Sequence, residues 1–130
     1  MNLKLPLFSG RVPAGFPSPA EDHIEQYLDL NAWLIPHPEA TFLVRASGES
    51  MTGAGVFNQD ILVVDRSISA KHGHIVVASL DGELVVKRLH TKFGRIQLQS
   101  ENPKYPPIVL KNQSELHIWG VVTYVIHRPV

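Results

Sequence analysis

Ser50 is the residue whose type and surroundings first suggest chemistry. It lies in the run ASGESMTGAG, residues 46–55, between Gly48 and the pair Gly53 and Gly55. A serine hydroxyl is a weak nucleophile until a base accepts its proton. The run lacks the GK[ST] ending of a phosphate-binding loop, and none of the seven histidines can be tied to Ser50 by spacing. By itself, the run favours a serine that caps a turn after a strand.

A lysine could serve as the base if it were neutral. The reference pKa of lysine is about 10.4, and full burial can lower it by roughly 3–5 units. In the run ELVVKRL, residues 83–89, an extended strand would direct Lys87 to one face and Arg88 to the other. Both faces are mostly apolar, so alternation does not decide which cation is buried. Arginine cannot lose its proton in a protein, so if either residue is a general base, it is Lys87. Taken alone, Lys87 would be interpreted as a surface lysine on an edge strand.

The elements that must position these residues are predicted to be strands. From Thr41 onward, β-branched and aromatic runs alternate with turn residues. The pair Asp81-Gly82 between two runs is typical of a type I′ hairpin. The pattern predicts a mainly β fold, a strongly curved or closed antiparallel β domain. The runs are TFLVRAS, DILVVD, HIVVASL, ELVVKRL, RIQLQS and LHIWGVVTYVI.

The N-terminal part of the chain is predicted to differ from the rest. Prolines and glycines within residues 1–18 favour an extended, mobile N-terminal arm. Ser18 as a cap, Pro19 at the first helical position and Glu21 in a capping box predict one short helix near residues 19–30. We therefore expect an arm, 1–18, followed by a single β domain, 19–130.

Composition excludes several classes of function. The chain has 130 residues, which suits one domain, and twelve basic and twelve acidic residues give a net charge of zero. This balance argues against a strongly basic nucleic-acid surface. There is no cysteine, so disulfides and thiolate metal sites are excluded, and the chain fits a reducing, cytoplasmic compartment. No stretch has the length of a membrane span.

Other chemically capable residues have plainer interpretations. His72 and His74 form an H-x-H pair, but without a third ligand they are expected to be turn residues, so no metal site is predicted. Asp60 and Asp65 bracket an apolar run and are expected to be strand-end groups. Trp119, in the last apolar run, belongs to a core or an interface and could anchor a partner.

Several motifs together resemble the LexA/UmuD family of self-cleaving serine peptidases. SGESM is followed by DILVVD and then by HGHIVVASLDGELVVKRL, and FPSPAEDHIEQYLDLN also resembles the UmuD branch. The resemblance runs from about Pro6 to the C-terminus. It implies a Ser–Lys dyad with Ser50 as nucleophile and Lys87 as general base. It also implies an oxyanion hole made by the backbone N–H groups of Glu49 and Ser50.

The same resemblance implies a substrate within the chain. Family members cut an Ala-Gly or Cys-Gly bond in their own N-terminal arm, and Ala14-Gly15 in RVPAGFPSP stands at the matching place. No cofactor is implied. The implied partners are a second copy in a homodimer, a RecA–single-stranded-DNA filament as activator, and a UmuC-like Y-family polymerase subunit. The function implied is SOS-response self-cleavage, after which the processed form serves as accessory subunit of an error-prone translesion DNA polymerase.

Three alternatives remain open at this point. The chain could be a non-enzymatic polymerase- or RecA-binding module with a vestigial dyad. It could be a signal peptidase-like enzyme acting on other proteins, although those normally carry a membrane anchor. It could be a regulator that binds DNA directly, against which the neutral charge and the missing recognition helix argue.

Overall fold

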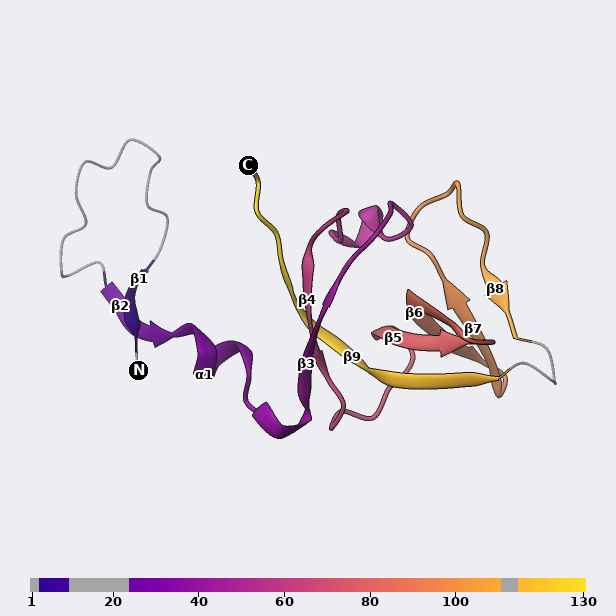
Figure 1. Ribbon diagram of the computed structural model, residues 1–130, viewed down its shortest axis with the longest axis horizontal. Helices are drawn as coiled ribbons and strands as arrows, with labels where there is room; N and C mark the ends of the chain where they lie inside the picture. The colour runs from indigo at the N-terminus through magenta and orange to yellow at the C-terminus, as the bar shows by residue number, and fades with distance from the viewer. Residues whose placement is uncertain (1–2, 10–23, 111–114) are drawn as a thin grey trace. The chain divides into compact units, whose positions relative to one another are not determined.

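A computed structural model describes residues 3–9, 24–110 and 115–130 (Figure 1). The chain falls into two compact units, residues 1–36 and residues 37–130. The mainly β character predicted from the sequence is confirmed. None of the helices in the described ranges has the length and apolar character needed to cross a membrane.

The first unit contains two paired strands and a short helix. Strand β1 (Lys4–Phe8) pairs antiparallel with β2 (Ile24–Asp29), and helix α1 (Leu30–Leu34) follows directly. The side chain of Asp29 caps α1 by accepting hydrogen bonds from the N–H groups of Asn31 and Ala32, at 3.0 and 3.4 Å.

The helix predicted near residues 19–30 is wrong for its described part. Residues Ile24–Asp29 form β2, and the helix begins only at Leu30. Pairing with β1 overrides the local helical pattern, since Leu28 lies opposite Leu5 in the register. Ser18, Pro19 and Glu21 lie outside the described residues, as does most of the predicted arm.

The second unit is built on one antiparallel sheet. The strand order is β3-β4-β9-β5-β6-β7-β8. Strands β3 and β8 are the outer members and do not pair with each other in the part of the chain that the structure describes. The sheet is therefore open. Of the predicted strongly curved or closed domain, the closed alternative is wrong, and the strong curvature stays a prediction. The strands are β3 (Thr41–Arg45), β4 (Ile61–Asp65), β5 (Ile75–Leu80), β6 (Glu83–Lys92), β7 (Arg95–Gln99), β8 (Ile108–Val109) and β9 (Leu116–Ile126), with 3-10 turns at Pro38–Ala40 and Thr52–Ala54.

Strand β9 joins the two parts of this sheet. Its C-terminal half pairs with β4 and its N-terminal half pairs with β5 (Figure 1). Val121 belongs to both pairings, since it lies opposite Asp65 of β4 and Val76 of β5. The register shifts near Gly120, where an added Cβ would lie 2.7 Å from Val64 Cγ1. Because a Cβ there would clash with Val64, glycine is required where β9 passes closest to β4.

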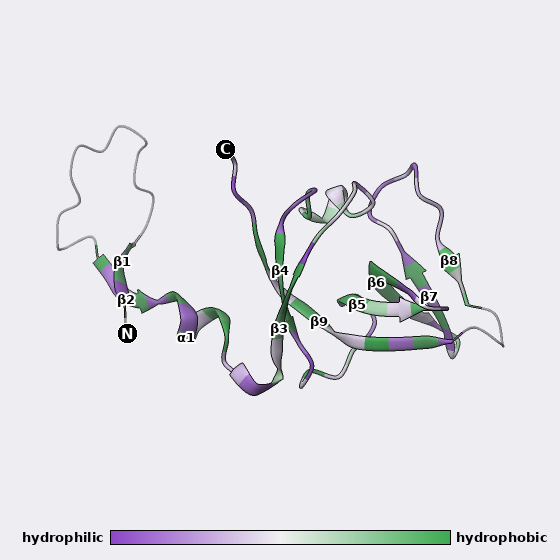
Figure 2. Ribbon diagram, in the orientation of Figure 1, coloured by the Kyte–Doolittle hydropathy of each residue, from purple (hydrophilic) through white to green (hydrophobic). Residues whose placement is uncertain are grey.

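Apolar stretches are prominent in β4, β5 and β9 (Figure 2). Two apolar clusters stabilise the sheet. One contains buried residues of β4, of the segment after β3 and one residue of β5, and the other contains buried residues of β5, β6, β7 and β9. Burial of each valine, leucine or methionine side chain contributes roughly 1.5–3 kcal/mol relative to exposure. The members are Ala46, Met51, Val56, Leu62, Val64 and Val77 in the first cluster, and Val76, Ala78, Leu89, Leu98 and Val121 in the second.

The hairpin predicted at Asp81-Gly82 is confirmed. It joins β5 to β6, and both residues have positive φ, 49° and 88°, as a type I′ turn requires. This turn fixes the register of β6 against β5, so it also fixes the position of Lys87 along β6 relative to β5. Lys87 lies opposite the fully buried Val76.

Two aspartate–histidine pairs hold the ends of β4. At one end Asp60 contacts His127 at 2.6 Å, and at the other Asp65 contacts His37 at 2.8 Å. Both aspartates are buried, as strand-end groups, in agreement with the sequence interpretation. Burial raises the pKa of Asp65, but hydrogen bonds from Ser67 and His37 outweigh it and hold the pKa below its usual value. The hydrogen bond to Asp65 raises the pKa of His37.

Replacing Asp65 with asparagine is expected to destabilise the protein in a pH-dependent way. The Asp65 contribution is present above its ordinary pKa of 3.8 and is lost as pH falls through the lower folded value. The His37 contribution is present below its ordinary pKa of 6.5 and is lost as pH rises through the higher folded value. Urea denaturation should show the largest difference between wild type and variant near about pH 5, with smaller differences near about pH 2 and pH 9.

The exposed Glu83 offers a control for this experiment. Glu83→Gln removes one carboxylate without a buried partner, so its effect on unfolding should be small at each pH. A constant difference between wild type and Asp65→Asn across the three pH values would contradict the pairing with His37.

Candidate active site

The segment that carries Ser50 leaves β3 and is anchored by two hydrogen bonds just before Ser50. The N–H of Ala46 donates to the Asp60 carbonyl at 2.7 Å, and the N–H of Gly48 donates to Asn58 Oδ1 at 2.9 Å. Gly48 has a φ of 88°, in the left-handed region that favours glycine. Glycine at this position therefore permits the turn that precedes Ser50.

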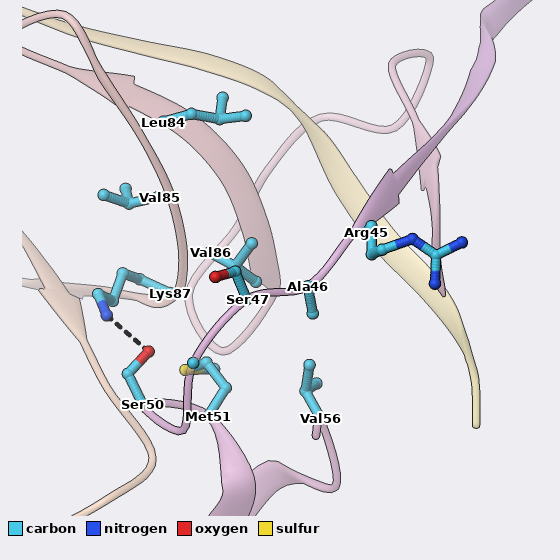
Figure 3. A pocket seen from close by; sticks show the side chains of 11 residues that line it. Arg45, Ala46, Ser47, Ser50, Met51, Val56, Leu84, Val85, Val86 and Lys87 are labelled. Atoms are coloured by element: carbon cyan, nitrogen blue, oxygen red, sulfur yellow. Dashed lines mark hydrogen bonds between the residues drawn. The ribbon is translucent and has the colours of Figure 1, made fainter. Parts of the chain in front are cut away.

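Ser50 and Lys87 meet at this turn. Lys87 Nζ donates a hydrogen bond to Ser50 Oγ at 2.9 Å, although the two residues are 37 positions apart in the sequence (Figure 3). At this distance the amine can also accept the hydroxyl proton once it is neutral. Desolvation by burial lowers the pKa of Lys87 below its ordinary 10.5. The structure thus brings together the two side chains that the sequence pairs as nucleophile and base.

A third side chain lies against the lysine. Lys87 Nζ is 5.9 Å from the centroid of the Tyr105 ring. A cation over an aromatic face is stabilised in its charged form, by roughly 0.5–1 kcal/mol at an exposed site. Tyr105 therefore opposes part of the effect of burial on Lys87.

Arg88, the other cation of the run, is directed elsewhere. Its Nη1 donates to the Gly73 carbonyl at 2.6 Å and its Nε contacts Glu101. The alternation of a strand separates these two neighbours, as the sequence predicts. Only Lys87 of this pair reaches Ser50.

The two residues line a cleft of about 210 Å³. Residues of the Ser50 turn form one side, and residues 84–87 of β6 form the other (Figure 3). Leu84 is well exposed, so the β6 side of the cleft is open to solvent. An extended segment of chain could enter alongside β6.

The edge of β6 that faces the cleft presents main-chain N–H and C=O groups that do not bond to β5. Pairing of β6 with β7 begins only at Arg88, so residues 83–87 pair with β5 alone among the described strands. Hydrogen-bonded pairs alternate along an antiparallel ladder, and the hairpin closes at Leu80 and Glu83. The N–H and C=O groups of Leu84 and Val86 therefore point away from β5. They form an edge that a further strand could join.

The Ser50 turn also presents backbone donors. Within the described residues, the N–H groups of Glu49 and Ser50 have no hydrogen-bond acceptor. Free N–H groups beside a nucleophile can bind the oxyanion of an acyl-transfer reaction. This arrangement is what an oxyanion hole at these two residues would require.

Other residues singled out in the sequence lie apart from the cleft. His72 Nδ1 accepts from the Thr91 N–H and His74 Nδ1 from the Lys71 N–H, both at 3.0 Å, so the two act as turn residues as expected. No group of potential metal ligands occurs among the described side chains. Trp119 is partly exposed on β9 and packs edge-on against His117.

Sequence reasoning did not identify the 101–105 turn, ENPKY. Its Glu101 N–H donates to the Ser50 carbonyl at 2.8 Å, and its Asn102 side chain donates to the Glu49 carbonyl at 2.9 Å. These contacts join segments about fifty residues apart. No pattern in the sequence connects them, because the link depends on how β6 and β7 return the chain to the Ser50 turn.

Comparison with known proteins agrees with the geometry. A family model described as Peptidase S24-like matches residues 6–123. The chain belongs to this family. Among relatives of the chain, Protein ImpA of Escherichia coli is 52% identical over 124 residues, which cover 95% of this chain and 83% of ImpA. Protein MucA of Escherichia coli is 42% identical over 128 residues, which cover 97% of this chain and 87% of MucA.

A repressor is also among the relatives. The LexA repressor of Bordetella pertussis is 40% identical over 124 residues, which cover 95% of this chain but only 56% of the repressor. The resemblance to the LexA/UmuD family is thus confirmed. Ala14 and Gly15, the predicted cleavage site, lie outside the described residues, and their role stays a prediction.

Proposed function

We propose that this protein is a serine peptidase that cleaves its own N-terminal arm between Ala14 and Gly15. The observation that carries the proposal is the 2.9 Å contact between Lys87 Nζ and Ser50 Oγ in an open cleft of an S24-like chain. A serine beside a partly desolvated lysine is an activated nucleophile. The free edge of β6 supports docking of an extended arm as an added strand.

The reaction follows from these groups. Neutral Lys87 accepts the proton of Ser50 Oγ as that oxygen attacks the carbonyl carbon of Ala14. The N–H groups of Glu49 and Ser50 donate to the oxyanion of the tetrahedral intermediate. Lys87 returns the proton to the nitrogen of Gly15, the C–N bond breaks, and Ala14 is held as an ester on Ser50. Water, activated by Lys87, hydrolyses the ester.

The covalent attachment of the substrate arm favours rapid self-cleavage, and it also requires that cleavage be controlled. A substrate on the same chain, or on a dimer mate, is already held near the nucleophile, which can contribute roughly 7–11 kcal/mol toward the barrier. An arm that stayed docked would cut itself at once. We therefore propose that the cleavage-competent state is minor and that a RecA–single-stranded-DNA filament favours it by binding it more tightly.

The processed form then acts as a binding module. We propose that it is a homodimer and the accessory subunit of a UmuC-like error-prone polymerase in the SOS response. Removal of residues 1–14 would change the surface that the protein offers to the polymerase. The mainly β unit of residues 37–130 holds the cleft without help from the arm, since all the described lining residues belong to it.

Intact-mass spectrometry tests this function. Wild-type protein and Ser50→Ala are incubated at about pH 10, where a substantial fraction of lysine is neutral without a filament, and the lowered pKa of Lys87 increases that fraction. The wild type is expected to yield fragments that correspond to a break between Ala14 and Gly15, and Ser50→Ala is expected to remain intact.

A second set of conditions contains RecA, single-stranded DNA and ATP at neutral pH. Cleavage of the wild-type protein under these conditions would support the filament as activator. A wild-type protein that stays intact under both sets of conditions, with the fold retained, would instead favour the non-enzymatic accessory module.

A further inference from the structure

The 101–105 turn is fastened to the Ser50 turn by three hydrogen bonds. The Glu101 N–H donates to the Ser50 carbonyl at 2.8 Å, and the Gly53 N–H donates to the Glu101 carbonyl at 2.7 Å. The third bond runs from Asn102 Nδ2 to the Glu49 carbonyl at 2.9 Å. The first two are main-chain bonds, so Asn102 makes the only side-chain contribution among these three.

The Asn102 bond ends on the peptide group that carries the Ser50 N–H. The carbonyl of Glu49 and the N–H of Ser50 belong to one planar peptide unit, so fixing the oxygen also fixes the direction of the N–H. A hydrogen bond accepted at the oxygen polarises the unit and makes its N–H a stronger donor. Thr52 also donates to this oxygen, but from longer distances of 3.2 Å for its hydroxyl and 3.3 Å for its N–H.

We propose that Asn102 is a positioning residue for self-cleavage, which orients and polarises the Glu49–Ser50 peptide so that the Ser50 N–H faces the developing oxyanion. The inference rests on the proposed function, because the oxyanion is that of the Ala14–Gly15 reaction. Asn102 does not touch the reacting atoms. It acts through the main chain of the nucleophile, whereas Lys87 acts on the serine hydroxyl.

Asn102 has a second contact that a test must leave in place. Its Oδ1 accepts from the Lys104 N–H at 3.0 Å and so shapes the 101–105 turn itself. Serine can accept the same bond two residues ahead, because its hydroxyl forms the equivalent short-range turn. A serine side chain is too short to keep the bond to Glu49. Asn102→Ser therefore removes the polarising contact, adds no charge and retains the turn acceptor.

The first readout is the pH profile of self-cleavage by intact-mass spectrometry. Loss of one oxyanion donor costs about 10²–10³ in rate, and weakening a donor should cost part of that, about tenfold. We expect Asn102→Ser to lower the high-pH plateau by about this factor and to leave the inflection set by Lys87 unchanged. The proposal would be overturned if the high-pH rate of Asn102→Ser equalled that of wild type, or if the inflection shifted while that rate was retained.

The second readout does not need cleavage. In a ¹H–¹⁵N NMR spectrum of full-length protein, Asn102→Ser should shift the amide resonance of Ser50 more than those of distant residues. If wild type fails to cleave, the proposed function fails, while this shift still reports on the Glu49–Ser50 peptide. An unmoved Ser50 resonance would refute the positioning role in either case. Asn31→Ser, at an exposed position of the other unit, is the matched control and should change neither readout.

Discussion

Replacing Lys87 with methionine is expected to stop self-cleavage between Ala14 and Gly15. Methionine keeps the unbranched, apolar stem but has no group that can accept the proton of Ser50. A positioned general base contributes about 10²–10⁴-fold to rate, and the loss should be at least in that range. Intact-mass spectrometry over a time course at about pH 10 measures it. Lys87→Arg should be equally inactive, since arginine keeps the charge but stays protonated.

The pH dependence of the wild type provides the decisive comparison. Lysine is a base only when neutral, so the rate should rise by about tenfold per pH unit below its pKa and level off above it. Because desolvation lowers the pKa of Lys87, the inflection should lie below 10.5. Both Lys87 variants should show no such inflection. An inflection that survives in Lys87→Met would assign the base to another group.

A matched lysine variant controls for charge. Lys92 lies at the exposed far end of the same strand, and Lys92→Met removes an equal charge from β6. It should cleave as wild type does. Lys87→Met should also resist urea at least as well as wild type at neutral pH, because the desolvated ammonium opposes folding when charged. A folded but inactive Lys87→Met would therefore separate chemistry from stability.

Much of the sheet could be predicted because its determinants are local. The β-branched runs give β3, β4, β5, β6, β7 and β9, and Asp81-Gly82 gives the hairpin that sets the register of β6. The short strand β8 was not predicted, since two residues are too few for a pattern. Strand β2 was mistaken for helix because its partner β1, which decides its conformation, lies fifteen residues upstream.

The candidate site could be predicted only in part. Ser50 and Lys87 were paired by chemistry and by family resemblance, since alternation along β6 left Lys87 and Arg88 equivalent. What excludes Arg88 is its contact with Glu101, a residue that became relevant only once the chain was folded. The same holds for Asn102 and Tyr105. Their contacts arise from the return of the chain after β7, which no local pattern records.

Replacing Gly53 with alanine is expected to reduce both stability and cleavage. A Cβ at Gly53 would lie 2.5 Å from the Glu101 carbonyl oxygen and 3.3 Å from its carbonyl carbon. Both atoms belong to the main chain, so a turn must move to make room. Overpacking of this kind costs about 1–3 kcal/mol of unfolding free energy. A displacement of about 1 Å at the nucleophile can cost about 10²-fold in rate, which we expect in the cleavage assay.

Gly94→Ala is the control that separates strain from displacement. Gly94 has a φ of 74°, and its added Cβ would meet no atom within 4 Å. Alanine there adds left-handed strain of about 1–2 kcal/mol, similar to the loss expected at Gly53, but at the β6–β7 hairpin, which contributes no residue to the lining of the cleft. Urea denaturation should therefore rank the two variants together, whereas mass spectrometry should find only Gly53→Ala slow to cleave. Equal cleavage rates at equal stability would mean that contact between the Ser50 turn and the 101–105 turn does not position the nucleophile.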